Sequence, residues 1–498
     1  MALLELRKVS KAFPGVQALN QVDMDVRAGE VHALIGENGA GKSTLIKLLS
    51  GVYGLDSGAI YFDGCEATFN SPQESQRAGI RTLYQEPNLL PRLSVAENIF
   101  LGDEPRLKWL PLIDWHQMRV QAARLLDMLG LSIPPETPVS ALSVAEQQMI
   151  ELAKTLHVRA RLLIMDEPTA TLSRREVDIL FRVIRVIKAQ GIGVVFVSHR
   201  LDEVLEIADR ATILRDGRRV TTVDIVDSSL DQLVRLISGR PGAHLFTRHR
   251  STTRPMREAL RLEGISRAST FEEVSFTLRS GEITGLTGPI GSGRTALVRA
   301  IFGLERFDSG SIFVNEQPVA IRSPQDAIAL GIGLLPAERN EQALLLEMAA
   351  PENISLAALG SAGPLINRQE ELALAEQYID RLRIKLPAIE SKVKYLSGGT
   401  QQKIILSRWL AVRSRILIFD EPTRGIDIGG KIEIYRLLAD LARQGMAILI
   451  VSSEFFELTR LCDRVLVMRA GRLVASLEGD QITAEALTRH VVGDSTGP

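Results

Sequence analysis

Six short apolar runs recur along the chain, three in each half, and each one immediately precedes a polar motif. They are residues 31–35, 162–165 and 194–197, then 283–286, 416–419 and 447–451. Runs that are apolar almost throughout predict strands covered on both faces, which is typical of a largely parallel sheet between helices. The motifs then fall at strand ends, where open α/β sheets bind ligands.

Two stretches rich in helical patterns, residues 92–157 and 347–411, separate the early strands of each half from the later ones. Within residues 146–157, the apolar positions Met149, Ile150, Ala153 and Leu156 share one face of a helix. Each half is therefore expected to combine a sheet with its own helical portion.

A phosphate-binding loop occurs twice. The first copy reads Gly36, Glu37, Asn38, Gly39, Ala40, Gly41, Lys42 and Ser43, followed by Thr44, and it fits GxxxxGK(S/T) completely. The second copy runs over residues 288–295 and keeps Gly288, Gly293 and Thr295, but Arg294 replaces the lysine. The offset is 288 − 36 = 252 at the loop and 420 − 166 = 254 at the acidic motif, so the chain is an internal duplication.

At 498 residues the chain exceeds what one hydrophobic core usually serves, in agreement with two domains. We predict domains at residues 1–240 and 258–498, joined by a linker at 241–257 that begins with the turn signal Pro241-Gly242. Four arginines make this linker basic. A solvated connector is the favoured reading, and contact with lipid headgroups or RNA is the alternative.

Charge and composition exclude several classes of protein. The formal net charge of −1 gives no support to non-specific nucleic-acid binding. Two cysteines, Cys65 and Cys462, exclude a disulfide framework and a cysteine-based metal site, and they suit a reducing cytoplasm. The start of the chain lacks the apolar stretch of a secretory signal, and no apolar run approaches the ~20 residues of a membrane span. Any membrane role is expected to go through a partner.

The first half carries a full set of nucleotide chemistry. Glycines let loop N–H groups turn toward phosphate, Lys42 is expected to reach the β- and γ-phosphates, and Ser43 to ligate Mg²⁺. The strand ending at Asp166 and Glu167 supplies a second Mg²⁺ ligand and a general base for the attacking water.

Three further residues complete this set. Gln85 is expected to contact Mg²⁺ and sense the γ-phosphate, His199 to contact the γ-phosphate, and Phe13 to stack on adenine. Each residue type alone is usually structural or exposed, and it is their joint order along the chain that is specific.

That order resembles the ATPases of ABC transporters. The segments Leu142-Ser143-Val144-Ala145-Glu146-Gln147-Gln148 and Leu396-Ser397-Gly398-Gly399-Thr400-Gln401-Gln402 resemble signature motifs, and each precedes an Asp-Glu-Pro-Thr segment. The tandem layout, residues 293–295, residues 336–339 and residues 423–427 resemble more narrowly the double ATPase subunits of bacterial monosaccharide importers of the ribose, galactose, arabinose and xylose type.

The resemblance implies an α/β fold class: two tandem P-loop NTPase domains of the ABC type, each a mostly parallel sheet core with a helical subdomain and an antiparallel β edge. It also implies that nucleotide lies between the loop of one domain and the signature of the other. Site one would combine Phe13, Lys42, Ser43, Gln85, Asp166, Glu167 and His199 with Ser397, Gly398 and Gly399. Whether the halves pair within one chain or between two stays open.

Site two would combine Arg294, Thr295, Asp420 and Glu421 with Ser143, and it is expected to be weakened. Ala337 stands opposite Gln85, where relatives commonly have glutamate, which leaves Glu338 as a stand-in. Ser453 stands opposite His199, and no aromatic residue stands opposite Phe13.

The first signature is also altered. Ala145 replaces a glycine, and Ser143 with Glu146 reads as a helix capping box. Glu146 either occupies donors that would serve phosphate or simply caps the helix and faces water.

The resemblance implies the ATP-hydrolysing subunit of a sugar importer, with ATP and Mg²⁺ as cofactors. It would be peripheral on the cytoplasmic face of the bacterial inner membrane, and would bind the coupling helices of transmembrane permease subunits through the Gln85 surface and residues 87–140. A periplasmic sugar-binding protein would deliver the substrate, and no nucleic acid is expected. The alternatives are a nucleoside importer ATPase and a soluble tandem ATPase acting on ribosomes or nucleic acid.

Overall fold

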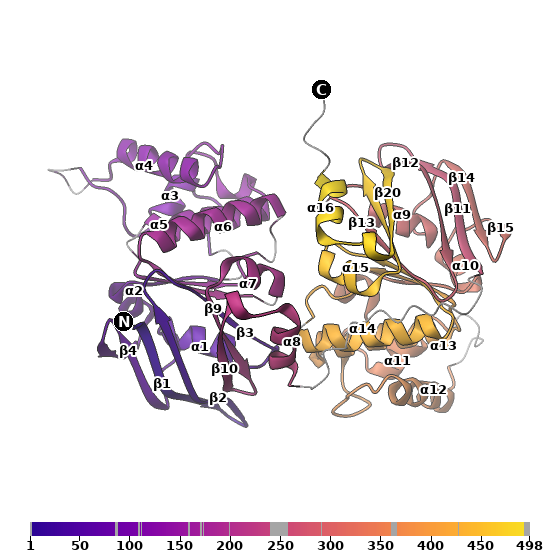
Figure 1. The fold of residues 1–498 in the computed structure, drawn as a ribbon, viewed down its shortest axis with the longest axis horizontal. Helices are drawn as coiled ribbons and strands as arrows, with labels where there is room; N and C mark the ends of the chain where they lie inside the picture. The colour runs from indigo at the N-terminus through magenta and orange to yellow at the C-terminus, as the bar shows by residue number, and fades with distance from the viewer. Residues whose placement is uncertain are drawn as a thin grey trace. The chain divides into compact units, whose positions relative to one another are not determined.

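The computed structural model describes residues 2–84, 88–107, 110, 112–157, 160–169, 172, 174–198, 200–239, 257–289, 291–359, 366–426 and 428–492. The chain forms two compact units, residues 1–243 and 244–498 (Figure 1). The predicted linker at 241–257 lies outside the described residues except for Arg257, and the predicted domain boundaries stay predictions.

The first unit contains two sheets. A four-stranded antiparallel sheet has the order β2-β1-β4-β5, and a six-stranded sheet has the order β10-β9-β3-β8-β7-β6. Within the larger sheet all neighbours are parallel except β9 and β10. The strands are β1 Ala2–Phe13, β2 Val16–Arg27, β3 Val31–Gly36, β4 Ser57–Phe62, β5 Cys65–Ala67, β6 Ile80–Leu83, β7 Leu162–Asp166, β8 Gly193–Val197, β9 Arg210–Arg215 and β10 Arg218–Asp224.

Most helices of the first unit connect these strands, and α3, α4 and α5 form a separate helical portion. They are α1 Lys42–Leu49, α2 Pro72–Ala78, α3 Val95–Ile99, α4 Trp115–Met128, α5 Val144–His157, α6 Arg174–Ala189, α7 Leu201–Ile207 and α8 Leu230–Ser238. Figure 1 shows α3, α4 and α5 at the end of the unit opposite the antiparallel strands β1, β2 and β4. The helical stretch predicted over residues 92–157 corresponds to α3–α5.

The second unit repeats this plan. Its antiparallel sheet has the order β12-β11-β14-β15 and its larger sheet the order β16-β17-β18-β13-β19-β20. The strands are β11 Glu258–Arg267, β12 Phe271–Arg279, β13 Ile283–Thr287, β14 Ser309–Val314, β15 Gln317–Val319, β16 Ile332–Leu335, β17 Ile416–Asp420, β18 Ala447–Val451, β19 Arg464–Arg469 and β20 Arg472–Glu478. The helices are α9 Arg294–Ile301, α10 Pro324–Ala329, α11 Ala350–Ser355, α12 Arg368–Arg381, α13 Gly398–Ala411, α14 Ile428–Arg443, α15 Phe455–Leu461 and α16 Ala484–Val492.

All six predicted strands are confirmed as β3, β7, β8, β13, β17 and β18, and each is buried over nearly its whole length. The α/β class, the parallel cores and the helical portions are confirmed as well. The expected antiparallel β edge takes two forms in each unit: a separate antiparallel sheet, and one antiparallel strand at the rim of the parallel sheet.

The two sheets of the first unit share a core with the helix that follows the phosphate loop. Leu45 and Ile46 of α1 are about 1% exposed and pack in one cluster with Leu4 and Leu6 of β1 and Leu34 of β3. Fully burying a leucine stabilises a fold by roughly 1.5–3 kcal/mol. The loop between β3 and α1 is therefore held at both ends by core packing.

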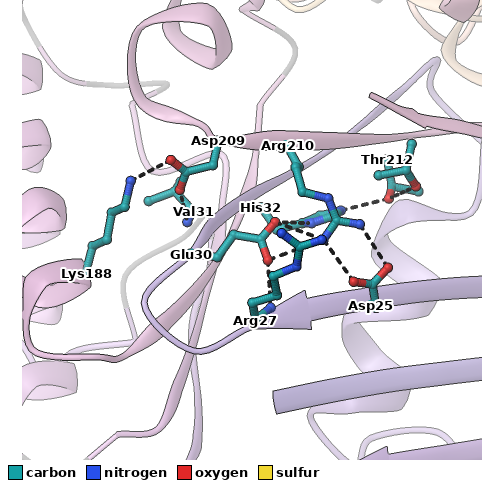
Figure 2. A network of polar contacts seen from close by, with 10 residues as sticks. Asp25, Arg27, Glu30, Val31, His32, Lys188, Asp209, Arg210 and Thr212 are labelled. Carbon is teal, nitrogen blue, oxygen red and sulfur yellow. Dashed lines mark hydrogen bonds and ion pairs between the residues drawn. The ribbon is translucent and has the colours of Figure 1, made fainter. Parts of the chain in front are cut away.

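A buried polar network also joins the two sheets of the first unit, and Figure 2 shows it. Arg210 of β9 donates two hydrogen bonds of 2.9 Å to Asp25 of β2 and lies 3.3 Å from Glu30. His32 of β3 lies 3.1 Å from Glu30 and 2.7 Å from Thr212. The network fixes the start of the strand that leads into the phosphate loop.

We predict that Arg210→Met lowers the free energy of unfolding at neutral pH by about 3 kcal/mol, because it leaves Glu30 buried without its guanidinium partner. Arg119→Met, which removes an exposed pair with Glu136 at 3.6 Å, should cost under about 1 kcal/mol. Urea unfolding of both variants measures the difference, and equal small losses would contradict the role of the network.

The same variant has a predicted pH dependence. The hydrogen bonds from Arg210 lower the pKa of Asp25 below its ordinary value of 3.8. A carboxyl group whose pKa is lower in the folded than in the unfolded protein stabilises the fold at any pH above its unfolded pKa. This stabilisation is lost as the pH falls through the folded pKa. The difference in free energy of unfolding between the wild-type protein and Arg210→Met should therefore become smaller below about pH 4.

Candidate functional site

The first phosphate loop packs so tightly that its opening residue must be glycine. A Cβ on Gly36 would lie 2.3 Å from the carbonyl oxygen of Leu214 in β9, far inside contact distance. At the other end of the loop, Gly41 has φ 103° and caps α1. A glycine-rich loop that leads into a helix N-terminus in this way is the arrangement by which backbone N–H groups bind phosphate.

Lys42 closes the loop on itself. Its Nζ donates to the carbonyl oxygens of Gly36 at 2.8 Å and Glu37 at 2.9 Å, and the residue is 8% exposed. The ammonium group therefore lies over the loop, where the phosphates of a nucleotide would bind. Ser43 follows it in the first turn of α1.

Asp166 is the last residue of β7, and Glu167 follows it. Burial and the neighbouring charge of Glu167 raise the pKa of Asp166, whereas Lys42 acts in the opposite direction. Glu167 has φ 49°, a left-handed backbone that is uncommon outside glycine, and its amide donates to the Val197 carbonyl at 2.9 Å. This hydrogen bond to β8 holds the backbone of Glu167 in its left-handed conformation at the end of the strand.

A buried cluster links the acidic motif to the end of β8, and sequence reasoning did not find it. Glu203 accepts hydrogen bonds from Thr169 at 2.6 Å, from Ser198 at 3.3 Å and from Arg200 at 2.7 Å. Burial raises the pKa of Glu203. The cluster fixes the residues on both sides of position 199.

Phe13 lies at the end of β1, half-buried, in an edge-on contact with Tyr53 whose ring centroids are 5.2 Å apart. Tyr53 follows α1 and was not predicted as part of the site. An aromatic residue just beyond the loop helix was the signal available in the sequence.

The second loop resembles the first at its glycines and carries a different side chain at the lysine position. A Cβ on Gly288 would lie 1.9 Å from the Met468 carbonyl oxygen, matching Gly36, and Gly293 caps α9 with φ 95°. Among the described residues, however, Arg294 donates to no carbonyl of its own loop, whereas Lys42 donates to two. Its Nη1 donates to the carbonyl of Ser452 at the end of β18, 3.1 Å away, and lies 4.0 Å from Glu421.

Glu421, the counterpart of Glu167 in the second unit, already accepts a hydrogen bond from a neighbouring side chain. Glu421 has φ 49°, like Glu167, and accepts a 3.2 Å hydrogen bond from Ser453, the residue opposite His199. Burial raises the pKa of Glu421, and Arg294 opposes this effect. Asp420 is 4% exposed and its pKa is likewise raised by burial, with Thr295 opposing through a hydrogen bond.

The two signature segments begin their helices differently. The Ser143 amide and hydroxyl both donate to Glu146 at 2.8 Å, and the Glu146 amide donates back to Ser143 at 3.3 Å, so the predicted capping box is confirmed. Ser397 has no acidic partner in its cap, and its hydroxyl instead donates to the Thr400 hydroxyl at 3.0 Å. Gly398 and Gly399 start α13 directly behind it.

Several predicted residues are not brought together by the described structure. Gln85 and His199 lie outside the described residues. Ser397, Gly398 and Gly399 belong to the second unit, and their pairing with the first loop stays a prediction. Ala337, opposite Gln85, has only a methyl side chain and cannot replace the amide of a glutamine. Glu338 forms an ion pair with the exposed Arg424.

Two kinds of comparison bear on the family. The family model described as "ABC transporter" matches residues 19–170 and 271–424. A putative ribose/galactose/methyl galactoside import ATP-binding protein from Agrobacterium fabrum is 46% identical over 495 residues, covering 99% of this chain and 97% of that one. The chain is a member of the ABC transporter family.

Other members of the ABC transporter family agree over the whole length. A ribose import ATP-binding protein from Rubrobacter xylanophilus is 47% identical and covers 97% of this chain and 96% of its own length. One from Geobacillus kaustophilus is 44% identical with 99% coverage of both. Proteins of this ABC family bind ATP and hydrolyse it, so the chain is an ABC-type ATPase with two cassettes.

A solved structure of an archaeal ribosome recycling factor, in complex with a ribosomal stalk protein, has a TM-score of 0.66. It covers 97% of this chain and 92% of that chain at 19% identity. The likeness is one of fold alone.

We predict that Gly36→Ala lowers the affinity of the first loop for a fluorescent ATP analogue at least about tenfold, a loss of ~1.4 kcal/mol. The added Cβ displaces the loop from the Leu214 carbonyl and misdirects its N–H groups. Gly54→Ala is the control, since nothing lies within 4 Å of its Cβ and its φ is not positive. Similar titrations for both variants would contradict the packing argument.

Proposed function

We propose that this chain is the ATP-hydrolysing, energy-coupling subunit of an importer for ribose or a related monosaccharide. The observation that carries the proposal is the similarity of 44–47% identity to ribose and ribose/galactose import ATP-binding proteins over both cassettes. A likeness confined to one cassette would support ATP binding only. A likeness across both, with one intact and one altered loop, supports this narrower role.

In site one, the chain's own residues would orient the reaction. Lys42 would leave its loop carbonyls for the β- and γ-phosphates, and the loop amides would bind the same oxygens. Glu167 would accept a proton from the water that attacks the γ-phosphorus, while the bond to the bridging oxygen breaks and ADP leaves. Gln85 and His199 would orient this water and the γ-phosphate, and Phe13 would stack on the adenine.

The first unit also fits Mg²⁺. Asp166 and Glu167 are adjacent carboxylates, and burial with mutual repulsion raises the pKa of Asp166, so a divalent cation would relieve an unfavourable charge pair. Asp166, Ser43 and Gln85 would hold the ion together with phosphate oxygens. When bound, the ion neutralises charge on the phosphates.

Site two would bind nucleotide without turning it over efficiently. Arg294 spans from the loop to the Ser452 carbonyl and Glu421, where a γ-phosphate would otherwise meet the end of β18. Glu421 is occupied by Ser453 and lacks a histidine beside it. The opposing signature has Ser143 hydrogen-bonded to Glu146, which withdraws donors from a phosphate.

The partners follow from the same proposal. Permease subunits would bind to the surface around Gln85 and to the helical portion of the first unit. A periplasmic sugar-binding protein would supply the substrate. The chain would be peripheral on the cytoplasmic face of the inner membrane. Among the described residues, none of the helices combines the length and hydropathy of a membrane span.

Two other functions share parts of this pattern. A nucleoside importer ATPase would use the same chemistry, and the transported substrate alone separates it. A soluble ATPase acting on ribosomes is the other alternative, and the likeness to a ribosome recycling factor, at 19% identity, extends to the fold alone.

We predict that Glu167→Gln lowers kcat for ATP hydrolysis by ~10² to 10⁴, because it removes the general base of the complete site. Glu421→Gln should lower kcat less than about threefold, since Arg294 and Ser453 already engage that carboxylate. The two variants are matched in chemistry and in backbone conformation. An equal loss of kcat in both would rule out unequal sites.

The transport role is tested by uptake. With its permease subunits in vesicles and the binding protein on the opposite side, the chain should support ATP-dependent uptake of labelled ribose or galactose, and Glu167→Gln should abolish it. Uptake of labelled nucleosides tests the nucleoside importer, and ribosome pelleting tests the soluble ATPase. Uptake of nucleosides alone, or ATP-dependent pelleting without uptake, would replace the proposal by the corresponding alternative.

A further inference from the structure

Arg339 makes an unusual set of contacts in the second unit. It begins a short π-helical turn, Arg339–Ala343, a few residues after β16, and its side chain is half-buried. Nε donates to the side-chain oxygen of Gln401 at 3.1 Å. Nη1 and Nη2 donate to the carbonyl oxygens of Arg424 at 2.7 Å and Gly425 at 3.2 Å.

These acceptors belong to two different parts of the unit. Gln401 lies in the first turns of α13, which begins with the signature glycines, and its amide group donates to the Val393 carbonyl at 3.1 Å. Arg424 and Gly425 lie in the turn after β17, next to Asp420 and Glu421. One guanidinium therefore ties the signature helix to the turn that follows the acidic motif.

The guanidinium also occupies the space beside the first signature glycine. A Cβ on Gly398 would lie 2.6 Å from Nη2 of Arg339 and 3.1 Å from the Gly425 carbonyl oxygen. Burial lowers the pKa of Arg339, although an arginine remains charged near neutral pH. A planar fork with several donors suits three acceptors in two segments, and a lysine ammonium does not offer that geometry.

The first half has no arginine in this position. The 252-residue offset of the loops puts Pro87 opposite Arg339, and the 254-residue offset of the signatures puts Val144 opposite Gly398. Val144 is 57% exposed, so among the described residues no side chain covers the start of that signature helix as Arg339 covers Gly398. The contact is a property of the second unit.

We propose that Arg339 is a positioning residue that holds the signature Ser397-Gly398-Gly399 against the turn at residues 423–426, and that this fixed signature is the one that completes site one. The second clause rests on the proposed function, in which the signature of the second unit meets the loop of the first. Arg339 acts through the signature backbone and not by touching the nucleotide.

Hydrogen exchange in the full chain tests the position itself. The amide of Gln401 donates to the Ser397 carbonyl at 2.9 Å and that of Thr400 to the Ser397 hydroxyl at 3.4 Å. Arg339→Ala should speed exchange over residues 397–401 at least about tenfold, a loss of ~1.4 kcal/mol of local stability, and leave residues 143–147 unchanged. Arg339→Lys should behave like Arg339→Ala, and unchanged exchange in both variants would overturn the proposal.

A double-mutant cycle tests the contact with Gly398. Gly398→Ala should lower kcat for ATP hydrolysis more in the wild-type background than in Arg339→Ala, because the added Cβ collides with the guanidinium only when it is present. If the losses of kcat caused by the two substitutions simply add in the double variant, the contact with Arg339 is not the reason why position 398 is glycine.

Turnover tests the link to the reaction. Arg339→Ala should lower kcat about ten- to a hundredfold with little change in nucleotide affinity at the first loop, since a displaced catalytic partner slows the reaction without removing the binding loop. Arg381→Ala is the control, because Arg381 also joins two segments of the second unit, α12 and the residue after α14, through Gln444 at 2.9 Å, and should leave kcat unchanged. Faster exchange at 397–401 with wild-type kcat would overturn the pairing in the proposed function, whereas unchanged exchange would overturn the role of Arg339 alone.

Discussion

The site depends on the close approach of the phosphate loops to the strand beside them. Gly36 approaches the Leu214 carbonyl, and Gly288 approaches that of Met468, so closely that a single added carbon would lie 2.3 Å or less from a backbone oxygen. The loop is thus positioned by backbone against backbone, with α1 or α9 packed into the core behind it. Because backbone contacts set this position, side chains of the loop can change while the backbone keeps its place.

That constraint explains how the second half changed its side chains while keeping the backbone geometry of its acidic motif. Glu167 and Glu421 share φ 49°, and both amides bond to the neighbouring strand, so the acidic motifs have one backbone geometry. What differs is the surrounding side chains. Lys42 returns to its own loop, whereas Arg294 reaches the end of β18 and lies near Glu421. The second site is altered by substitution on an unchanged frame, not by unfolding of the frame.

The sequence predicted what depends on local pattern. The buried strands were predictable because parallel strands covered on both faces are apolar throughout, and the Ser143–Glu146 cap because its partners are three residues apart. The antiparallel sheets were expected only as an edge, since strands such as β1 are interrupted by bulges that break the alternation of side chains. The contacts of Arg339 were not predictable, because they join residues 62 to 86 positions apart. The same holds for Thr169 and Glu203, whose separation is 34.

The distribution of altered parts follows a physical logic under the proposed pairing. A closed site needs a loop from one unit and a signature from the other, so an altered loop and an altered signature harm one site only if they face each other. Arg294 and the Ser143–Glu146 cap would both fall on site two. The intact loop around Lys42 would face the signature that Arg339 holds in place. Under that pairing every departure from the ABC pattern would be confined to one site, and the other would keep both of its halves, so altered motifs in this chain would leave one complete site for ATP hydrolysis.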